Sequence, residues 1–181
     1  MSRAYKFHNP DGLYFVSFAT VNWVDVFTRA VYCEIVVDSL KYCQSNLGMQ
    51  LYCWCLMPNH AHLIFRATDG RPAKLLGRFK EFTAKRIVKE IERNVRESRR
   101  NWLLRTFEAA GEKSSNVQRY QFWQHDNHPI ELISNYFIEQ KSHYIHQNPV
   151  EAGYVTEAHH WKYSSATDYS GGKGLVPVDF L

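Results

Sequence analysis

Residues 50–67 read QLYCWCLMPNHAHLIFRA, with an apolar, aromatic-rich run on each side of a Pro-Asn pair. Two such runs around a short turn signal are typical of antiparallel strands, so we expect a hairpin that turns at Pro58 and Asn59. Side chains two residues apart on a strand point to the same face of the sheet. We therefore expect His60 and His62 to present two imidazoles side by side.

The flanking sequence predicts a strand and a helix before the hairpin and a helix after it. LYFVSFATV, at 13–21, is rich in β-branched and aromatic residues and has the length of a strand. VYCEIVVDSLKYCQSNLG, at 31–48, has the apolar spacing of an amphipathic helix that stops at Gly48. A long basic helix is expected from about Pro72 to about Asn94.

The second half of the chain is predicted to hold one more strand and one more helix. Residues 95–117 are polar, and GEKSSN within them is typical of an exposed loop. VQRYQFWQ, at 117–124, is expected to be the fourth strand. A helix over 129–148 would begin at Pro129 and end before Pro149. From His159 onward we expect the chain to pack loosely.

The order strand, helix, strand, strand, helix, strand, with a further helix after it, predicts the fold class. It is typical of an α+β protein with a ferredoxin-like split βαβ sandwich, in which helices cover an antiparallel sheet. The 181 residues suit one domain over 1–181, with a core at about 5–169 and a tail at 170–181. Such a fold hosts many functions, so the function has to be argued from the site.

The charge distribution, the apolar runs and the cysteines indicate the class of partner and the cellular compartment. Ten of the 22 Lys and Arg residues lie between Lys74 and Arg100, the pattern of a surface for a polyanion or of a solvated helix face. With no signal-peptide-like start and no apolar run of the ~18 residues that a membrane span needs, we expect a cytoplasmic protein without a membrane partner. Four cysteines in that environment are expected to be reduced.

Two sets of partners for the histidine pair can be drawn from the sequence. Cys53 and Cys55 would complete a Cys₂His₂ zinc site with His60 and His62 if the turn contains only Pro58 and Asn59. If Met57 also belongs to the turn, Trp54 faces His62 and the cysteines point away. We expect the cysteines to be core residues, with zinc as the alternative.

The predicted tyrosine helix carries a polar stripe. Gln140, Tyr144 and Asn148 recur every four residues, and Lys141 lies three residues before the tyrosine. The structural alternative is a tyrosine ring that continues an apolar run and an asparagine that ends the helix.

Three motifs in order resemble one family. MPNHAHLIF, then YIHQNPVEAGYV, then WKYSSA are similar to segments of the single-tyrosine transposases of the HUH nuclease superfamily, in particular the REP-associated and insertion-sequence types. The likeness runs from the first strand to about Tyr169 and includes FWQ at 122–124. Glu151 departs from the family where a basic residue is common, and Tyr154 where an aliphatic residue is usual.

This resemblance implies an enzyme, a metal-dependent single-stranded DNA endonuclease and strand transferase that acts through a 5′-phosphotyrosine intermediate. It implies Tyr144 as nucleophile and a divalent ion, Mg²⁺ or Mn²⁺, on His60, His62 and Asn148. The implied partner is single-stranded DNA with a hairpin, and relatives include both homodimers and chains that act alone. The cations expected to contact DNA are Lys74, Arg78, Lys85 and Lys141.

Two readings from other functional classes remain beside the transposase. One is a non-catalytic nucleic-acid-binding module, although the first and third strands lack the aromatic signature of RNA-recognition sheets. The other is a structural protein stabilised by zinc on the cysteines.

Overall fold

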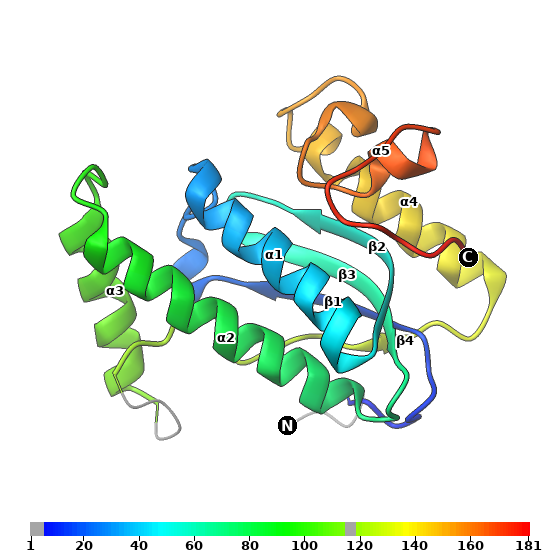
Figure 1. Cartoon of the computed structure of the whole chain (residues 1–181), viewed down its shortest axis with the longest axis horizontal. Coiled ribbons are helices and arrows are strands. Elements are labelled where there is room, and N and C mark those ends of the chain that lie inside the picture. Colours follow the sequence, from blue (N-terminus) through cyan, green and yellow to red (C-terminus); the bar gives the residue numbers. More distant parts are fainter. Residues whose placement is uncertain (1–5, 115–118) are drawn as a thin grey trace.

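The computed structural model describes residues 6–114 and 119–181 and contains a four-stranded antiparallel sheet in the order β2-β3-β1-β4 (Figure 1). This order, with one helix between β1 and β2 and further helices between β3 and β4, confirms the ferredoxin-like α+β fold. The strands are β1 Tyr14–Ala19, β2 Met49–Leu56, β3 His60–Ala67 and β4 Ile130–Glu131.

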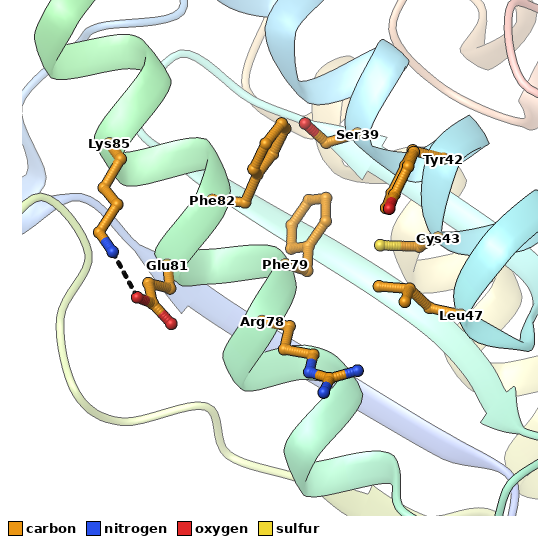
Figure 2. A pocket seen from close by; sticks show the side chains of 9 residues that line it. All are labelled: Ser39, Tyr42, Cys43, Leu47, Arg78, Phe79, Glu81, Phe82 and Lys85. Carbon is orange, nitrogen blue, oxygen red and sulfur yellow. Dashed lines mark hydrogen bonds and ion pairs between the residues drawn. The ribbon is translucent and has the colours of Figure 1, made fainter.

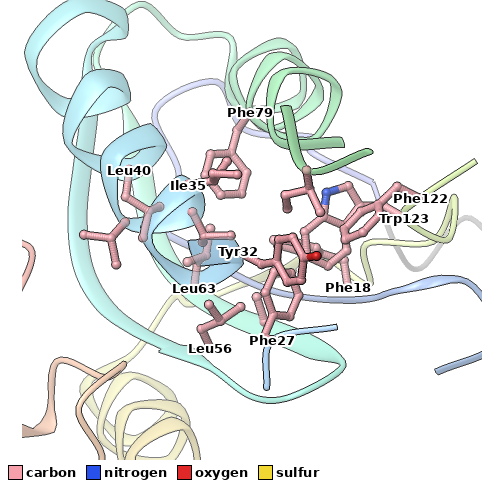
Figure 3. Packing of buried hydrophobic residues seen from close by; sticks show 14 of the residues in the cluster. Phe18, Phe27, Tyr32, Ile35, Leu40, Leu56, Leu63, Phe79, Phe122 and Trp123 are labelled. Atoms are coloured by element: carbon pink, nitrogen blue, oxygen red, sulfur yellow. The ribbon is translucent and has the colours of Figure 1, made fainter. Parts of the chain in front are cut away.

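Helices α1 (Ala30–Leu47) and α2 (Pro72–Arg93) pack side by side on one face of the sheet (Figure 1). Gly48 ends α1 in the left-handed region, with φ of 68°, as the sequence predicted. The larger hydrophobic cluster lies between these helices and the strands, and Figure 3 shows the rings of Phe18, Phe27 and Trp123 gathered in it. None of the helices within 6–114 and 119–181 combines the length and apolar character that a membrane span requires.

Helix α4 (Asn135–Glu151) packs against β2 and β3 from the other face of the sheet. It contributes Ile145 to a second, smaller apolar cluster with Phe15 of β1, Cys53 of β2 and Ile64 of β3. Side chains that alternate along each strand are thereby divided between two layers. His62 precedes Ile64 by two residues, so it lies in the layer that α4 covers.

The region 95–117 is not simply a loop, because Arg100–Glu112 form helix α3. Leu103 and Phe107, four residues apart, are buried on one side of α3. The predicted GEKSSN loop therefore begins inside a helix, and its residues 115 and 116 lie outside the described part of the chain.

The fourth strand is Ile130–Glu131, and its prediction at 117–124 was wrong. Residues 117 and 118 lie outside the described ranges, and in the rest only one antiparallel bridge, between Thr20 and Trp123, is formed. Phe122 and Trp123 are apolar because they fill the core, with the Trp123 indole donating a 3.0 Å hydrogen bond to the Thr83 hydroxyl.

The boundaries of the tyrosine helix and the packing of the tail also differ from the predictions. Helix α4 starts after Ser134, whose hydroxyl caps it, and runs through Pro149 to Glu151, although Pro149 has no N–H to donate to the carbonyl four residues earlier. The expected loose packing after His159 was wrong, because the segment includes α5 (Ala166–Tyr169), a buried Val176 and a bond from the Asp179 amide to the Leu51 carbonyl.

A buried carboxylate ties α3 to the start of α1. The Glu97 side chain is fully covered and accepts hydrogen bonds from Arg29 at 2.5 Å and from Arg99 at 3.2 Å. Arg99 also donates to the Asp25 carbonyl at 2.7 Å. Burial alone would raise the pKa of Glu97, but the hydrogen bonds from the two guanidinium groups outweigh it and lower that pKa to about 2.

We predict that Glu97→Gln lowers the free energy of unfolding by about 1 to 3 kcal/mol at pH 7, since both arginines partly reach solvent. A carboxylate with a lowered folded-state pKa stabilises the protein above pH ~4.5, and this contribution is lost as the pH falls toward 2. Urea unfolding should show the difference from wild type shrinking between pH 5 and pH 3. Glu108→Gln, which removes a surface ion pair with Arg119, is the matched control and should change little; an equal effect of both variants would contradict the account.

Candidate active site

Of the two turns that the sequence allowed, the hairpin between β2 and β3 has the shorter one, without Met57. The Met57 amide bonds to the His60 carbonyl at 2.8 Å, so only Pro58 and Asn59 form the turn. Cys55 therefore lies opposite His62 on one side, and Ser17 of β1 lies opposite it on the other. This register puts both histidines in the layer of α4.

His60 and His62 form a contiguous pair of imidazoles. Their ring centroids are 4.8 Å apart and the ring planes are inclined by 78°. His62 is 2% exposed, and neither of its ring nitrogens has a hydrogen-bond partner among the described residues. A buried nitrogen without a partner loses its hydration and gains nothing in return. The site therefore has the character of a ligand set whose partner is not part of the protein chain.

Both imidazoles are held in the neutral form that binds metal. Burial, with smaller contributions from His60 and Lys141, lowers the pKa of His62 to about 3. Burial also lowers the pKa of His60, while Asn148 and Asp25 act in the opposite direction. His60 Nδ1 lies 2.7 Å from Asn59 Oδ1, and Asn59 in turn donates to Asp25 at 2.8 Å. As the donor to this amide oxygen, Nδ1 carries the proton and Nε2 keeps a free lone pair.

Helix α4 brings the predicted tyrosine to the histidines. The Tyr144 ring centroid lies 5.2 Å from that of His62 and 6.0 Å from that of Phe15. The tyrosine is 39% exposed, so a large substrate can reach it from solvent. Asn148, one turn further along α4, is near enough to His60 to raise the pKa of that imidazole. The predicted residues His60, His62, Tyr144 and Asn148 thus meet at one place.

Lys141 adds a positive charge to this cluster. Its ammonium lies 5.6 Å from the centre of the Tyr144 ring and 5.0 Å from that of Phe15. Contacts of this length are cation–π interactions.

His146 faces away from the tyrosine, although it is only two residues distant. Its Nε2 lies 2.9 Å from the Ser165 hydroxyl, and its ring packs on Tyr169 of α5. Burial, with a smaller effect of His143, lowers the pKa of His146 to about 4. This residue fastens α4 to the C-terminal segment.

Among the described residues, the thiols of Cys53 and Cys55 form no common group of ligand atoms with the imidazoles of His60 and His62. Cys53 and Cys55 face the α4 layer, but both are fully buried, and burial raises the pKa of the Cys55 thiol to about 12. In the described ranges, three or more metal-type ligand atoms gather only at the exposed Glu157, His159 and His160, around the short helix η2 (Ala158–His160). The expectation that the cysteines are core residues agrees with this arrangement.

Three of the predicted DNA-contacting cations lie on the other side of the sheet. Lys74, Arg78 and Lys85 project from α2, in the layer that α2 shares with α1. Arg78 and Lys85 line a cavity of about 340 Å³ between these helices, with Lys85 paired to Glu81 at 2.5 Å (Figure 2). Of the four predicted cations, only Lys141 lies beside the histidine pair.

One further residue at the site was not predicted from the sequence. Trp23, in the short helix η1 (Val21–Trp23), is 56% exposed, and its ring centroid lies 5.5 Å from that of His60. Asn22 and Trp23 both have positive φ angles, 53° and 54°. Two successive non-glycine residues in this region cost about 1 kcal/mol each or more, and no glycine or proline marks the position.

We predict that acidification destabilises the metal-free protein between pH 7 and pH 5. Unfolded imidazoles with a pKa of about 6.5 take up protons in this range, whereas His62 and His146, with folded-state pKa values of about 3 and about 4, do not. The unfolded state then binds more protons, and each histidine should lower the free energy of unfolding by about 1 to 2 kcal/mol. Urea unfolding in EDTA at several pH values measures this loss of stability, and His146→Gln should remove about half of the loss. A free energy of unfolding that stays constant between pH 7 and pH 5 would contradict the burial of the two histidines.

Comparison with solved structures identifies relatives in fold. A structure described as the REP-associated tyrosine transposase bound to a REP hairpin matches 100% of this chain and 92% of its own, with 17% identity and a TM-score of 0.67. At this identity the likeness shows the fold. A putative transposase from Deinococcus radiodurans R1 matches 80% of this chain and 94% of its own, with 18% identity and a TM-score of 0.46. No curated protein sequence matches the chain.

A family model described as "Transposase IS200 like" matches residues 14–148. The matched region starts at the first residue of β1 and ends at Asn148, so it contains the hairpin histidines and the tyrosine of α4. It spans well over half of the chain. The protein therefore belongs to the IS200-like transposase family, the REP-associated and insertion-sequence type of tyrosine transposase.

Proposed function

We propose that this transposase is a metal-dependent single-stranded DNA endonuclease and strand transferase with Tyr144 as its nucleophile. The observation that carries the proposal is the contact of Tyr144 with His62, whose two ring nitrogens are buried and have no hydrogen-bond partner among the described residues. A phenol accessible to a polymer, two neutral imidazoles and a nearby ammonium are the groups that phosphodiester transfer requires.

The residues present fit a divalent cation. His60 and His62 would hold Mg²⁺ or Mn²⁺ through their free lone pairs, with Asn148 as the third, oxygen ligand. When bound, such an ion polarises the non-bridging oxygens of the scissile phosphate and offsets their charge. The bond between Asn59 and His60 would orient the His60 ring for this role.

The chain's own groups account for the covalent step. The Tyr144 oxygen forms a bond to phosphorus, the bond from phosphorus to the 3′-oxygen breaks, and that oxygen leaves as a 3′-hydroxyl after taking up a proton. The phenolic proton departs to solvent or to a base, and the Lys141 ammonium stabilises the phenolate that remains. The phosphotyrosine retains the energy of the original ester, so another 3′-hydroxyl can reverse the step and join two strands without ATP.

The proposed substrate is single-stranded DNA with a folded hairpin. The structural relative that covers the whole chain is described as bound to a REP hairpin. Lys141 would contact phosphates at the cut, whereas Lys74, Arg78 and Lys85 would contact phosphates only where the DNA passes around to the α2 layer. We propose that residues 1–181 act together as one such domain in the cytoplasm.

We predict a covalent protein–DNA adduct that depends on Tyr144. Wild-type protein incubated with a labelled hairpin-bearing single strand and Mn²⁺ should give a band that survives denaturing electrophoresis, because the phosphotyrosine bond is covalent. Tyr144→Phe lacks the attacking oxygen and should give none, while Tyr136→Phe, an exposed tyrosine on the same helix, should behave as wild type. An adduct with Tyr144→Phe would contradict the assignment of Tyr144 as the nucleophile. No adduct with wild type, although the DNA binds, would support the non-catalytic binding module instead.

We further predict that cleavage requires the histidine pair and not the exposed cluster near η2. His60→Ala and His62→Ala should each lower the cleavage rate at least about 100-fold, as EDTA should in wild type, because a ligand to the ion is lost. Binding of the same DNA should change only a few-fold. His159→Ala is the matched control and should cleave normally. Loss of cleavage in this variant alone would place the metal at the cluster near η2 and contradict the assignment to the histidine pair. Thermal unfolding of each variant verifies its fold.

A further inference from the structure

We propose that η1 and α3 form a groove that receives the single-stranded nucleotides next to the cleaved phosphate, with Trp23 and Trp102 as stacking platforms for bases. This inference rests on the proposed function, because it places the path of the same substrate. It adds a specificity surface that lies outside the histidine and tyrosine cluster. The cations assigned to this groove are Arg105 and Lys113.

Trp23 links the groove to the reacting centre. Its indole lies against His60, and more than half of its surface is exposed to solvent. The backbone that presents it is firmly held, since the Trp23 amide bonds to the Thr20 carbonyl at 3.0 Å and the Thr20 hydroxyl bonds to the Val24 carbonyl at 2.8 Å. An exposed tryptophan in an unfavourable backbone conformation adds little to folding, and strain of this kind is concentrated at functional sites.

Helix α3 contacts η1 and lies beside α2 at one end of the molecule (Figure 1). A cavity of about 360 Å³ is lined there by Asn22, the residue before Trp23, and by Trp102, Arg105, Thr106 and Lys113 of α3 and its end. Trp102 is 53% exposed. The bonds of Arg99 to Glu97 and to the Asp25 carbonyl fix the start of α3 against the segment that follows η1.

The chemistry of the lining selects single-stranded nucleic acid as the occupant. Arg105 and Lys113 take part in no ion pair among residues 6–114 and 119–181, and no acidic side chain lines the cavity. Unpaired cations next to exposed indoles match a chain that alternates phosphates with flat bases. Only an unpaired strand offers its base faces for such stacking, whereas a duplex keeps them covered. Because Asn22 lines the cavity and the next residue, Trp23, contacts His60, nucleotides that flank the cut would reach this groove.

Binding measurements on three DNA molecules test the proposal. Fluorescence anisotropy in EDTA, with every protein carrying Tyr144→Phe so that no cleavage occurs, would compare a blunt hairpin with the same hairpin carrying a single-stranded extension on its 5′ side or on its 3′ side. Trp23→Ala and Trp102→Ala should each weaken binding of one of the extended hairpins by roughly 5- to 100-fold, the range for one lost base stack. Binding of the blunt hairpin should change less than about twofold.

Three further variants keep the result interpretable. Trp23→Phe retains an aromatic face and should recover most of the affinity that Trp23→Ala loses, which a general loss of folding would not allow. Arg105→Gln should weaken binding of the same extended hairpin and reduce its dependence on salt. Tyr42→Ala removes an exposed aromatic ring in the α1 layer and should bind like the parent protein.

The outcomes separate this inference from the proposed function. Unchanged binding of both extended hairpins, or an equal loss on the blunt hairpin, would overturn the groove while leaving the Tyr144 adduct intact. Selective loss on an extended hairpin, together with no adduct from wild-type protein, would support the groove and refute the proposed chemistry.

Discussion

The position of the candidate site depends on the register of the β2–β3 hairpin. The two turn residues are held from outside the hairpin, since the Pro58 carbonyl accepts a bond from the Phe27 amide and the Asn59 carbonyl accepts one from the Thr20 amide, each at 2.8 Å. A slip of one residue would exchange the two faces of β3 and turn His62 into the core beneath α1 and α2. In the observed register His62 contacts Tyr144 of α4, so the bonds that hold the turn also determine the position of the site.

Two features of the candidate site destabilise the fold. The His62 ring is buried without a hydrogen-bond partner in residues 6–114 and 119–181, and Trp23 has a strained backbone conformation. The remaining structure offsets both, through a well-filled aromatic core on the α1 and α2 face and through the bond from His146 to Ser165 that fastens α4. A divalent ion on the histidines would convert the unfavourable burial into binding energy, since a ligand that binds only the folded state stabilises that state.

The sequence was sufficient for those parts of the structure that repeat a simple pattern. Alternation placed His60 and His62 on one face, a four-residue spacing placed Tyr144 and Asn148 on one stripe, and Gly48 marked the end of α1. Helix α3 was missed because its charged residues obscure the buried pair of Leu103 and Phe107, and β4 was missed because two residues carry no periodicity. Trp23 could not be assigned, since its position depends on positive φ angles and on a contact with a distant strand.

Locating the metal ion is the most direct test of the proposed reacting centre. Crystals soaked with Mn²⁺ and measured near its absorption edge should give an anomalous peak within bonding distance of His60 and His62, on the side that faces Tyr144 and Asn148. A peak confined to Glu157, His159 and His160, or to the buried cysteines, would contradict the claim that the hairpin register builds the reacting centre.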